Sequence, residues 1–248
     1  MTCLVLAAGY ATRLYPLTKN FPKPLLQVKE KTVLDWLVDD IADSCHPEKI
    51  AVITNHRFAH FFETWKSESK SSCPIQIIDD QTTDNDNRLG AVMDIQKAIE
   101  KAEIEDDLMV IAGDNVLDFS LGSFARYFHQ KHTTCIMRYQ FTPSNGPCPY
   151  GVCSCDEDDK VLDMEEKPAI PKSDWAVPPF YIYARKDLPL ICKAIRSGCE
   201  VDAPGSFIQW LCRQVPVHAM KMPGNRYDIG NLASYEKIQK EYKGILTI

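Results

Sequence analysis

Short apolar runs alternate with longer amphipathic stretches along the first half of the chain. The apolar runs, each about the length of a buried strand, are 2–8, 49–54, 74–79, 106–115 and 133–140. The amphipathic stretches, in which apolar residues recur at the intervals of a helix, are 33–45, 57–69, 91–102 and 120–132. Nearly continuous apolar strands separated by helices predict a parallel sheet that is covered on both faces.

The pattern changes after about residue 140. Residues 151–168 predict two short strands joined by an acidic turn, and residues 175–184 predict one further strand. The remaining predicted elements are a strand over 217–222 and helices over 188–197, 206–214 and 232–243. We expect this half to extend the same sheet, because no linker, repeat or low-complexity tract interrupts the chain.

Together these elements predict an α/β fold with a Rossmann-like, doubly wound sheet that is mixed but mainly parallel and has helices on both faces. We predict a single domain over 1–248 with two functional halves, about 1–140 and about 141–248. Ligands in such folds bind beyond the carboxyl ends of the parallel strands, so functional side chains are expected there.

Composition and charge narrow the classes of partner. The chain has 45% hydrophobic and 25% charged residues, which is ordinary for a globular protein, and a formal net charge of -6. This charge argues against a broad nucleic-acid surface, so a phosphate ligand must be held by a few placed cations. No apolar run reaches the roughly 18 residues of a membrane span, and the N-terminus lacks the flanks of a signal peptide. We expect a cytoplasmic protein whose 10 scattered cysteines are reduced thiols.

The loop after the first strand carries the strongest chemical signal, in the stretch LAAGYATRLYPLTKNFPKPLLQV. Gly9 permits close approach of the backbone to a ligand, and Arg13 and Lys23 supply positive charge. Pro22 and Pro24 restrict the backbone around the lysine, which limits where its ammonium is presented. A surface loop with two solvated cations is the alternative, but the position directly after the strand favours phosphate binding. We expect both cations on an exposed loop.

A second candidate site lies at the end of the apolar run 106–115, in the sequence IAGDN. Asp114 there places a carboxylate at the carboxyl edge of the sheet, where a ligand is expected. Such hard oxygen ligands suit Mg²⁺, which is usually held by one or two carboxylates together with phosphate oxygens. A turn or helix-capping aspartate is the alternative, and the residues alone leave both interpretations open.

The N-terminal stretch resembles the signature of the sugar nucleotidyltransferases, LAAGxGTRLxPLTxxxPKPLLxV, a family that includes the glucose-1-phosphate thymidylyltransferases. The matching residues are Leu6, Ala7, Ala8, Gly9, Thr12, Arg13, Leu14, Pro16, Leu17, Thr18, Pro22, Lys23 and Pro24. One departure is Ala11, where the family usually has a second glycine. We expect this alanine to narrow the allowed geometry of the loop slightly without loss of phosphate binding.

The resemblance implies how the first half holds a nucleotide. It assigns Arg13 and Lys23 as the catalytic cations, which stabilise charge on the triphosphate during transfer. The nucleotide-binding residues of the loop are then Leu6, Ala8 and Gly9. In the segment after the third strand, Gln81 follows a strand and can hydrogen-bond a base, and Gly90 resembles the glycine of the family's base-binding loop. Equal candidates for reading the base are Asn85, Asn87 and Arg88.

The resemblance also implies a metal site built from both halves. RYDIGNLASY is similar to the family's W-x-D-x-G motif before the last helix, which makes Asp228 the second ligand of Mg²⁺ beside Asp114. Tyr227 stands directly before this aspartate, and Arg226 precedes Tyr227. A capping role for Asp228 is the alternative. The two aspartates reach one ion only if the two halves share one cleft.

The acceptor side is implied by two short motifs. On the residues alone, Glu166 and Lys167 before a proline would be an ordinary surface pair. They resemble the family's EKP motif, in which the glutamate binds sugar hydroxyls and the lysine binds the acceptor phosphate. Tyr150 and Gly151 resemble the family's YG element, whose glycine backbone lies against the sugar.

The resemblance covers nearly the whole chain and implies a Mg²⁺-dependent nucleotidyltransferase that joins an NTP, dTTP or UTP, to a sugar 1-phosphate and releases pyrophosphate. Pro178 and Pro179 stand where Thr-Gly is common in the thymidylyltransferases, so we expect a reshaped acceptor pocket. The chain ends soon after its last predicted helix, so we expect a short form without the C-terminal extension of longer members.

Other functions remain open on the sequence. A cytidylyltransferase for phosphocholine or a similar phosphorylated small molecule shares the first loop, and a non-catalytic nucleotide-sugar-binding regulatory subunit shares the fold. A GT-A glycosyltransferase is disfavoured, because GDN is not its DxD metal motif. We expect no nucleic-acid or membrane partner, and leave homo-oligomerisation open.

Overall fold

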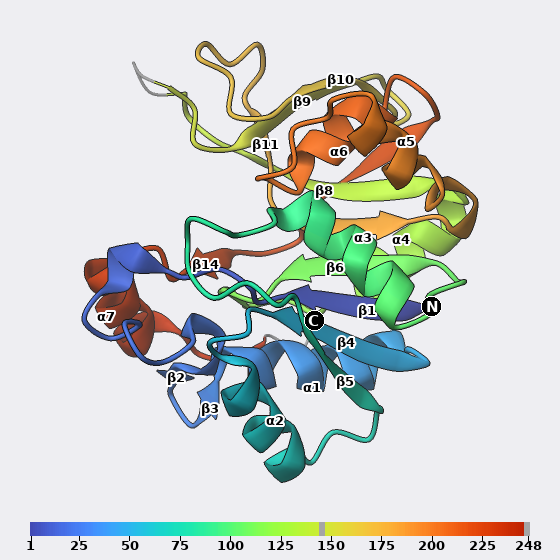
Figure 1. Cartoon of the computed structure of the whole chain (residues 1–248). Helices are drawn as coiled ribbons and strands as arrows, with labels where there is room; N and C mark the ends of the chain where they lie inside the picture. Colours follow the sequence, from blue (N-terminus) through green and yellow to red (C-terminus); the bar gives the residue numbers. More distant parts are fainter. Residues whose placement is uncertain (144–146, 246–248) are drawn as a thin grey trace.

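A ten-stranded mixed sheet forms the centre of the computed structural model, which describes residues 1–143 and 147–245 (Figure 1). Its strands from the first half are β1 (Thr2–Leu6), β4 (Lys49–Thr54), β5 (Ile75–Asp79), β6 (Leu108–Ala112) and β8 (Thr134–Gln140). Its strands from the second half are β9 (Gly151–Cys155), β10 (Val161–Glu165), β11 (Trp175–Val177), β12 (Phe180–Tyr183) and β13 (Val217–Lys221). The second half therefore extends the sheet of the first, as predicted.

The strand order is β10-β9-β11-β8-β12-β6-β1-β4-β5, and β13 pairs with β8. β5, β4, β1 and β6 are mutually parallel, and β12 is inserted antiparallel between β6 and β8. β8 and its parallel neighbour β13 therefore run in the same direction as β6. β11, β9 and β10 continue the sheet with antiparallel pairs. This confirms the predicted mixed, mainly parallel sheet.

The prediction of one strand over residues 175–184 was wrong. Pro178 and Pro179 separate β11 from β12, because proline has no N–H to continue a ladder. The break lets the two segments take different neighbours, β8 and β9 for β11 but β6 and β8 for β12. The carbonyl of Pro179 accepts the N–H of Ala112 at 3.2 Å, which ties the proline segment to the end of β6.

Helices cover both faces of the sheet (Figure 1). One face carries α1 (Val33–Cys45), α2 (Ala59–Glu68) and α4 (Gly122–Lys131), and the other carries α3 (Ala91–Lys101), α5 (Leu190–Arg196) and α6 (Gly205–Leu211). Because successive side chains of a strand point to opposite faces of the sheet, each face has its own hydrophobic core. Cys3 and Val5 of β1 pack on the first face, and Leu4 packs on the second. The sequence pattern predicted each of these helices.

Two small two-stranded sheets lie beside the main sheet. β2 (Gln27–Val28) pairs with β3 (Lys31–Thr32), and β7 (Asn115–Leu117) pairs with β14 (Arg226–Asp228). The sequence pattern did not reveal these four strands, which are two or three residues long. Short helical turns of the 3-10 type occur at Thr12–Leu14, Lys23–Leu25 and Arg185–Asp187.

The last helix, α7 (Leu232–Glu241), packs against the N-terminal loop in a separate apolar cluster (Figure 1). The hydroxyl of Tyr235 donates to the carbonyl of Gln27 at 2.7 Å, and the rings of Trp36 and Tyr242 meet edge to face. The last helix therefore fixes the position of the loop that follows β1. β14, which precedes this helix, lies on the same side of the molecule. None of the described helices is long and apolar enough to cross a bilayer.

Candidate active site

The parallel strands β1, β4, β5 and β6 all end at one edge of the sheet, and the loops that follow them meet there (Figure 1). The loop after β1 is fixed to its neighbours by hydrogen bonds: the amide of Asn55 donates to the carbonyl of Ala8 at 3.0 Å. The N–H of Gly113, after β6, donates to the carbonyl of Leu6 at 2.8 Å. The two predicted site segments are therefore adjacent, as their positions after neighbouring parallel strands require.

The glycine and the alanine of the N-terminal loop differ in backbone conformation. Gly9 has no positive φ, and a Cβ atom there would meet no heavy atom within 4 Å. Ala11 takes the left-handed conformation, with φ 46° and ψ 42°. Its carbonyl accepts hydrogen bonds from the N–H of Leu14 and the hydroxyl of Thr18, at 3.0 and 2.7 Å, and these hold the turn. The conformation that favours glycine thus falls on the position where the family has its second glycine.

The two cations of the loop differ in exposure. Arg13 is exposed, as predicted, and lines a cleft. Lys23 is only 8% exposed, so the expectation of an exposed loop was wrong for this residue. Its turn packs against Gly113, where an added Cβ would lie 3.5 Å from Pro24. Burial is possible because the ammonium forms ion pairs with carboxylates from distant parts of the chain.

Asp114 and Asp228 converge on the ammonium of Lys23. The Nζ atom lies 2.6 Å from Oδ2 of Asp114 and 3.5 Å from Oδ1 of Asp228. The pairing of β14 with β7 brings the second aspartate here, because it sets Asp228 opposite Asn115. The aspartates from the two halves of the chain thus lie together, and both also line the cleft.

The paired carboxylates fit a hard divalent cation. Their four oxygens are the ligand type that Mg²⁺ prefers, and both side chains are partly exposed, at 39% and 49%. No group of three or more His, Cys, Asp or Glu side chains suited to a metal occurs in residues 1–143 and 147–245. The remaining ligands of an ion held by Asp114 and Asp228 would therefore come from water or from a bound phosphate.

Asn115 and Arg226 form a network beside the aspartates that the sequence did not predict. The side-chain amide of Asn115 donates to Oδ1 of Asp114 at 2.8 Å, and its oxygen accepts from Nη1 of Arg226 at 2.8 Å. The guanidinium also lies over the rings of Tyr139 and Tyr150, 5.5 and 5.8 Å from their centroids. One signal was available: in a strand, residues 226 and 228 share a face, so Arg226 belongs with the predicted aspartate.

One cleft of about 570 Å³ joins the two halves of the chain. From the first half, its predicted site residues are Leu6, Arg13 and Asp114; from the second half, they are Tyr150, Gly151, Glu166, Lys167 and Asp228. Other lining residues that matter below are Asn115, Arg226, Pro178, Pro179 and Gly205. The predicted residues Ala8, Gly9, Lys23, Gln81 and Gly90 lie outside its described lining, although Lys23 contacts Asp114 and Asp228, which do line it. The shared cleft that the metal hypothesis requires is thus present.

The carboxyl group of Glu166 lies in the cleft against two glycines. A Cβ atom on Gly205 would lie 2.0 Å from Oε2 of Glu166, and one on Gly151 would lie 2.8 Å from the same oxygen. The carboxyl group therefore occupies space that only glycine leaves open. Burial raises the pKa of Glu166, and the nearby Lys167 partly offsets this. Gly205, which was not predicted, is as important for this geometry as the predicted Gly151.

Tyr150 links the acceptor residues to the arginine network. Its carbonyl accepts the N–H of Lys167 at 3.2 Å, while its ring lies under the guanidinium of Arg226. Lys167 has a positive φ of 48° and an exposed side chain. The backbone of Lys167 and the guanidinium of Arg226 therefore both contact Tyr150.

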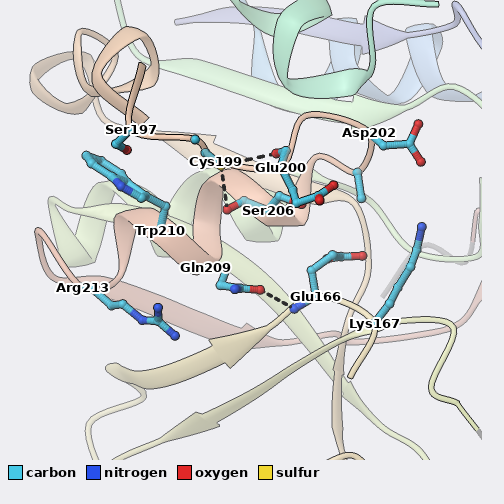
Figure 2. A pocket seen from close by; sticks show the side chains of 12 residues that line it. Glu166, Lys167, Ser197, Cys199, Glu200, Asp202, Ser206, Gln209, Trp210 and Arg213 are labelled. Atoms are coloured by element: carbon cyan, nitrogen blue, oxygen red, sulfur yellow. Dashed lines mark hydrogen bonds between the residues drawn. The ribbon is translucent and has the colours of Figure 1, made fainter. Parts of the chain in front are cut away.

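A second cavity of about 600 Å³ adjoins the cleft and shares four of its lining residues, Glu166, Lys167, Asp202 and Ala203. Figure 2 shows Lys167 at one side of this cavity and Trp210 and Arg213 at the other. The side-chain oxygen of Gln209 accepts the N–H of Glu166 at 2.7 Å, so α6 positions the backbone of the glutamate as well as its carboxyl group (Figure 2).

The predicted base-reading residues lie at the same edge of the sheet but do not touch the cleft. Gln81 is exposed with φ 68°, and its N–H donates to Oδ1 of Asp79 at 2.7 Å. Gly90 begins α3 with φ 89°, and a Cβ there would lie 2.5 Å from the carbonyl oxygen of Val201. Packing against the loop before α6 thus accounts for this glycine, and base recognition stays a prediction for both residues.

Comparisons with known proteins show the family of the chain. The model of the family described as nucleotidyl transferase matches residues 2–244. The chain belongs to this family. The resemblance drawn from the N-terminal loop is thereby confirmed at the level of the family.

Relatives that match most of the chain share about a quarter of its residues. The bifunctional protein GlmU of Methanocaldococcus jannaschii is 25% identical over 98% of this chain, and a UTP–glucose-1-phosphate uridylyltransferase of Synechocystis is 26% identical over 95%. This chain spans only 57% and 61% of the length of these two relatives. It spans 91% of the uridylyltransferase AglF of Haloferax volcanii, which is 24% identical over 93% of this chain.

The fold is also that of solved family structures. A structure of UDP-glucose pyrophosphorylase complexed with UDP-glucose matches with a TM-score of 0.80 and 20% sequence identity, over 97% of each chain. The match confirms the predicted fold class.

Proposed function

We propose that this chain transfers a nucleoside monophosphate unit from an NTP, UTP or dTTP, to a sugar 1-phosphate, and that the reaction requires Mg²⁺. One observation carries the proposal: a single cleft is lined by a phosphate-type loop and Asp114 from the first half, and by Glu166, Lys167 and Asp228 from the second. Membership of the nucleotidyl transferase family supports it, as do relatives whose names include glucose-1-phosphate.

The proposed step balances without a general base. A phosphate oxygen of the sugar 1-phosphate attacks the α-phosphorus of the NTP, and the bond from that phosphorus to the bridging oxygen breaks. Pyrophosphate leaves with the electron pair. Because a phosphate acceptor is already ionised at neutral pH, the protein mainly positions both substrates and stabilises developing charge.

The residues of the cleft divide this work. Arg13 in the lining, and Lys23 behind the two aspartates, supply positive charge that offsets that of the triphosphate. Lys167 faces the acceptor phosphate, and the carboxylate of Glu166 accepts hydrogen bonds from sugar hydroxyls. Mg²⁺ held by Asp114 and Asp228 would neutralise phosphate oxygens and fix their relative position. The lysine between these carboxylates limits their mutual repulsion in the absence of substrate.

A matrix of NTPs against phosphorylated acceptors tests the proposal, with pyrophosphate release as the measurement. We expect release with UTP or dTTP and a sugar 1-phosphate, and a loss of at least about 10²-fold for Asp114→Asn and for Asp228→Asn. Release only with CTP and phosphocholine would instead establish the cytidylyltransferase alternative. Tight binding of a nucleotide sugar without release from any pair would establish a regulatory subunit.

A further inference from the structure

Arg226 is a cation without an acidic partner. No carboxylate in the described parts of the chain lies within ion-pair distance of its guanidinium. Its neighbours are uncharged: Oδ1 of Asn115 accepts from Nη1 at 2.8 Å, and the hydroxyl of Tyr139 accepts from Nη2 at 3.5 Å. A partly buried guanidinium that keeps N–H groups unused is costly unless an anion completes its surroundings.

Three other arginines are neutralised by carboxylates, whereas Arg57, which has only uncharged partners, is exposed to solvent. Arg88 pairs with Asp202 at 3.0 Å, Arg213 pairs with Asp163 at 3.5 Å, and Arg138 pairs with Asp159. Beside the cleft, Lys23 likewise forms ion pairs with two aspartates. Arg226 differs because asparagine and tyrosine side chains orient it without compensating its charge, which leaves the charge available to a ligand.

The position of Arg226 indicates which kind of ligand it binds. Its strand also carries Asp228, and its guanidinium lies over Tyr150, whose carbonyl holds the N–H of Lys167. Arg13, the exposed cation of the N-terminal loop, also lines the cleft but comes from the first half of the chain. Arg226 and Lys167 therefore line the same cleft as the two aspartates, and neither forms an ion pair within the described residues.

We infer that Arg226 binds the phosphate of the acceptor and selects phosphorylated acceptors over free sugars. The inference rests on the proposed function and adds a residue to it. A guanidinium presents N–H groups in a planar fork that matches two phosphate oxygens, whereas the ammonium of Lys167 acts as a point charge. Asn115 and the two tyrosine rings fix the plane of that fork.

Calorimetric titration with glucose 1-phosphate and with inorganic phosphate tests the inference. We expect Arg226→Gln to weaken both ligands by about 10- to 100-fold, the range for losing a charge-assisted contact, while UTP binding changes little. Arg185→Gln is the matched control, because it makes the same charge change after β12, at the opposite edge of the sheet. It should leave both affinities unchanged.

The outcomes that overturn the inference are distinct from failure of the proposed function. Equal phosphate affinity in the wild type and Arg226→Gln, an equal loss in Arg185→Gln, or no binding of either probe to the wild type would each overturn it. If the glutamine variant does not fold, Arg226→Lys keeps the charge without the fork, and unchanged glucose 1-phosphate affinity in that variant would contradict the assignment. These titrations involve no turnover, so absence of pyrophosphate release from every substrate pair would count against the proposed function alone.

Discussion

At the scale of single residues, Ala11 carries a backbone conformation that alanine disfavours. Its left-handed φ of 46° is fixed by two hydrogen bonds to its carbonyl. The left-handed region destabilises a non-glycine residue by about 1–2 kcal/mol. Replacement by glycine removes this strain but costs about 0.5–1 kcal/mol, because glycine gives the unfolded chain more conformational freedom. We therefore expect Ala11→Gly to raise the free energy of unfolding by about 0.5–1 kcal/mol in urea denaturation.

A helical alanine provides the control for this substitution. Ala233 is exposed in the first turn of α7, where the same change should lower the free energy of unfolding by up to about 1 kcal/mol. A decrease for Ala11→Gly similar to that for Ala233→Gly would show that position 11 does not hold the left-handed conformation.

Asp94 is a second residue whose effect on the free energy of unfolding can be measured. It lies buried in the first turn of α3, Oδ1 has no hydrogen-bond partner among the described residues, and burial, then the charge of Asp80, raise its pKa from 3.8 to about 7. The folded state therefore retains a proton that the unfolded state releases near pH 4. This proton stabilises the fold at low pH, and the stabilisation is lost progressively as the pH rises from about 4 to about 7.

We expect Asp94→Asn, which cannot ionise, to gain stability over the wild type as the pH rises. The difference in free energy of unfolding should grow between pH 5 and 7 and level off above, reaching on the order of 1 kcal/mol or more. Chemical denaturation at pH 5, 6, 7 and 8 measures it. Asp86→Asn, at an exposed position of the preceding loop, is the control with no such trend. A pH-independent difference for Asp94→Asn would contradict the raised pKa.

At the scale of elements, α6 shapes the acceptor site through a missing side chain. Gly205 begins the helix and leaves the space in which Oε2 of Glu166 lies. Alanine suits a helix and the glutamate side chain can move, so we expect Gly205→Ala to fold normally. The displaced carboxylate should raise the KM of the sugar 1-phosphate about 10-fold, the cost of roughly one hydrogen bond to a charged group, with little change for the NTP.

A double-mutant comparison separates this effect from general damage to the pocket. If Gly205→Ala acts through Glu166, adding it to Glu166→Ala should not raise the acceptor KM further. Additive losses in the double variant would mean that the alanine disturbs the cleft in another way.

Local patterns predicted the helices and the main strands, and they predicted which loops carry chemistry. Asp114 follows a parallel strand that periodicity identifies, so its place at the carboxyl edge followed from the parallel sheet. Glu166 follows β10 in the antiparallel part of the sheet, so only the resemblance to the EKP motif indicated its site. The burial of Lys23 and the network of Asn115 with Arg226 depend on the pairing of β7 with β14, two segments more than 100 residues apart. No local pattern encodes such a pairing, because each strand is too short to show alternation.

At the scale of the whole molecule, the two halves meet in one cleft. The last helix packs on the N-terminal loop, and β14 brings Asp228 to Asp114, so the residues proposed to bind nucleotide and acceptor line one cleft. The central claim is that a phosphate on the acceptor side attacks a nucleotide on the other. Isotopic labelling tests this attack, because it shows which substrate supplied the phosphate oxygens of each product.

The most direct test uses a sugar 1-phosphate in which every phosphate oxygen is ¹⁸O, paired with the NTP that reacts fastest. Mass spectrometry of the products then locates the label. Direct attack by the acceptor phosphate on the α-phosphorus predicts a nucleotide sugar that retains all of the ¹⁸O, together with unlabelled pyrophosphate. Label in the released pyrophosphate, or consumption of NTP without a labelled nucleotide sugar, would contradict the account.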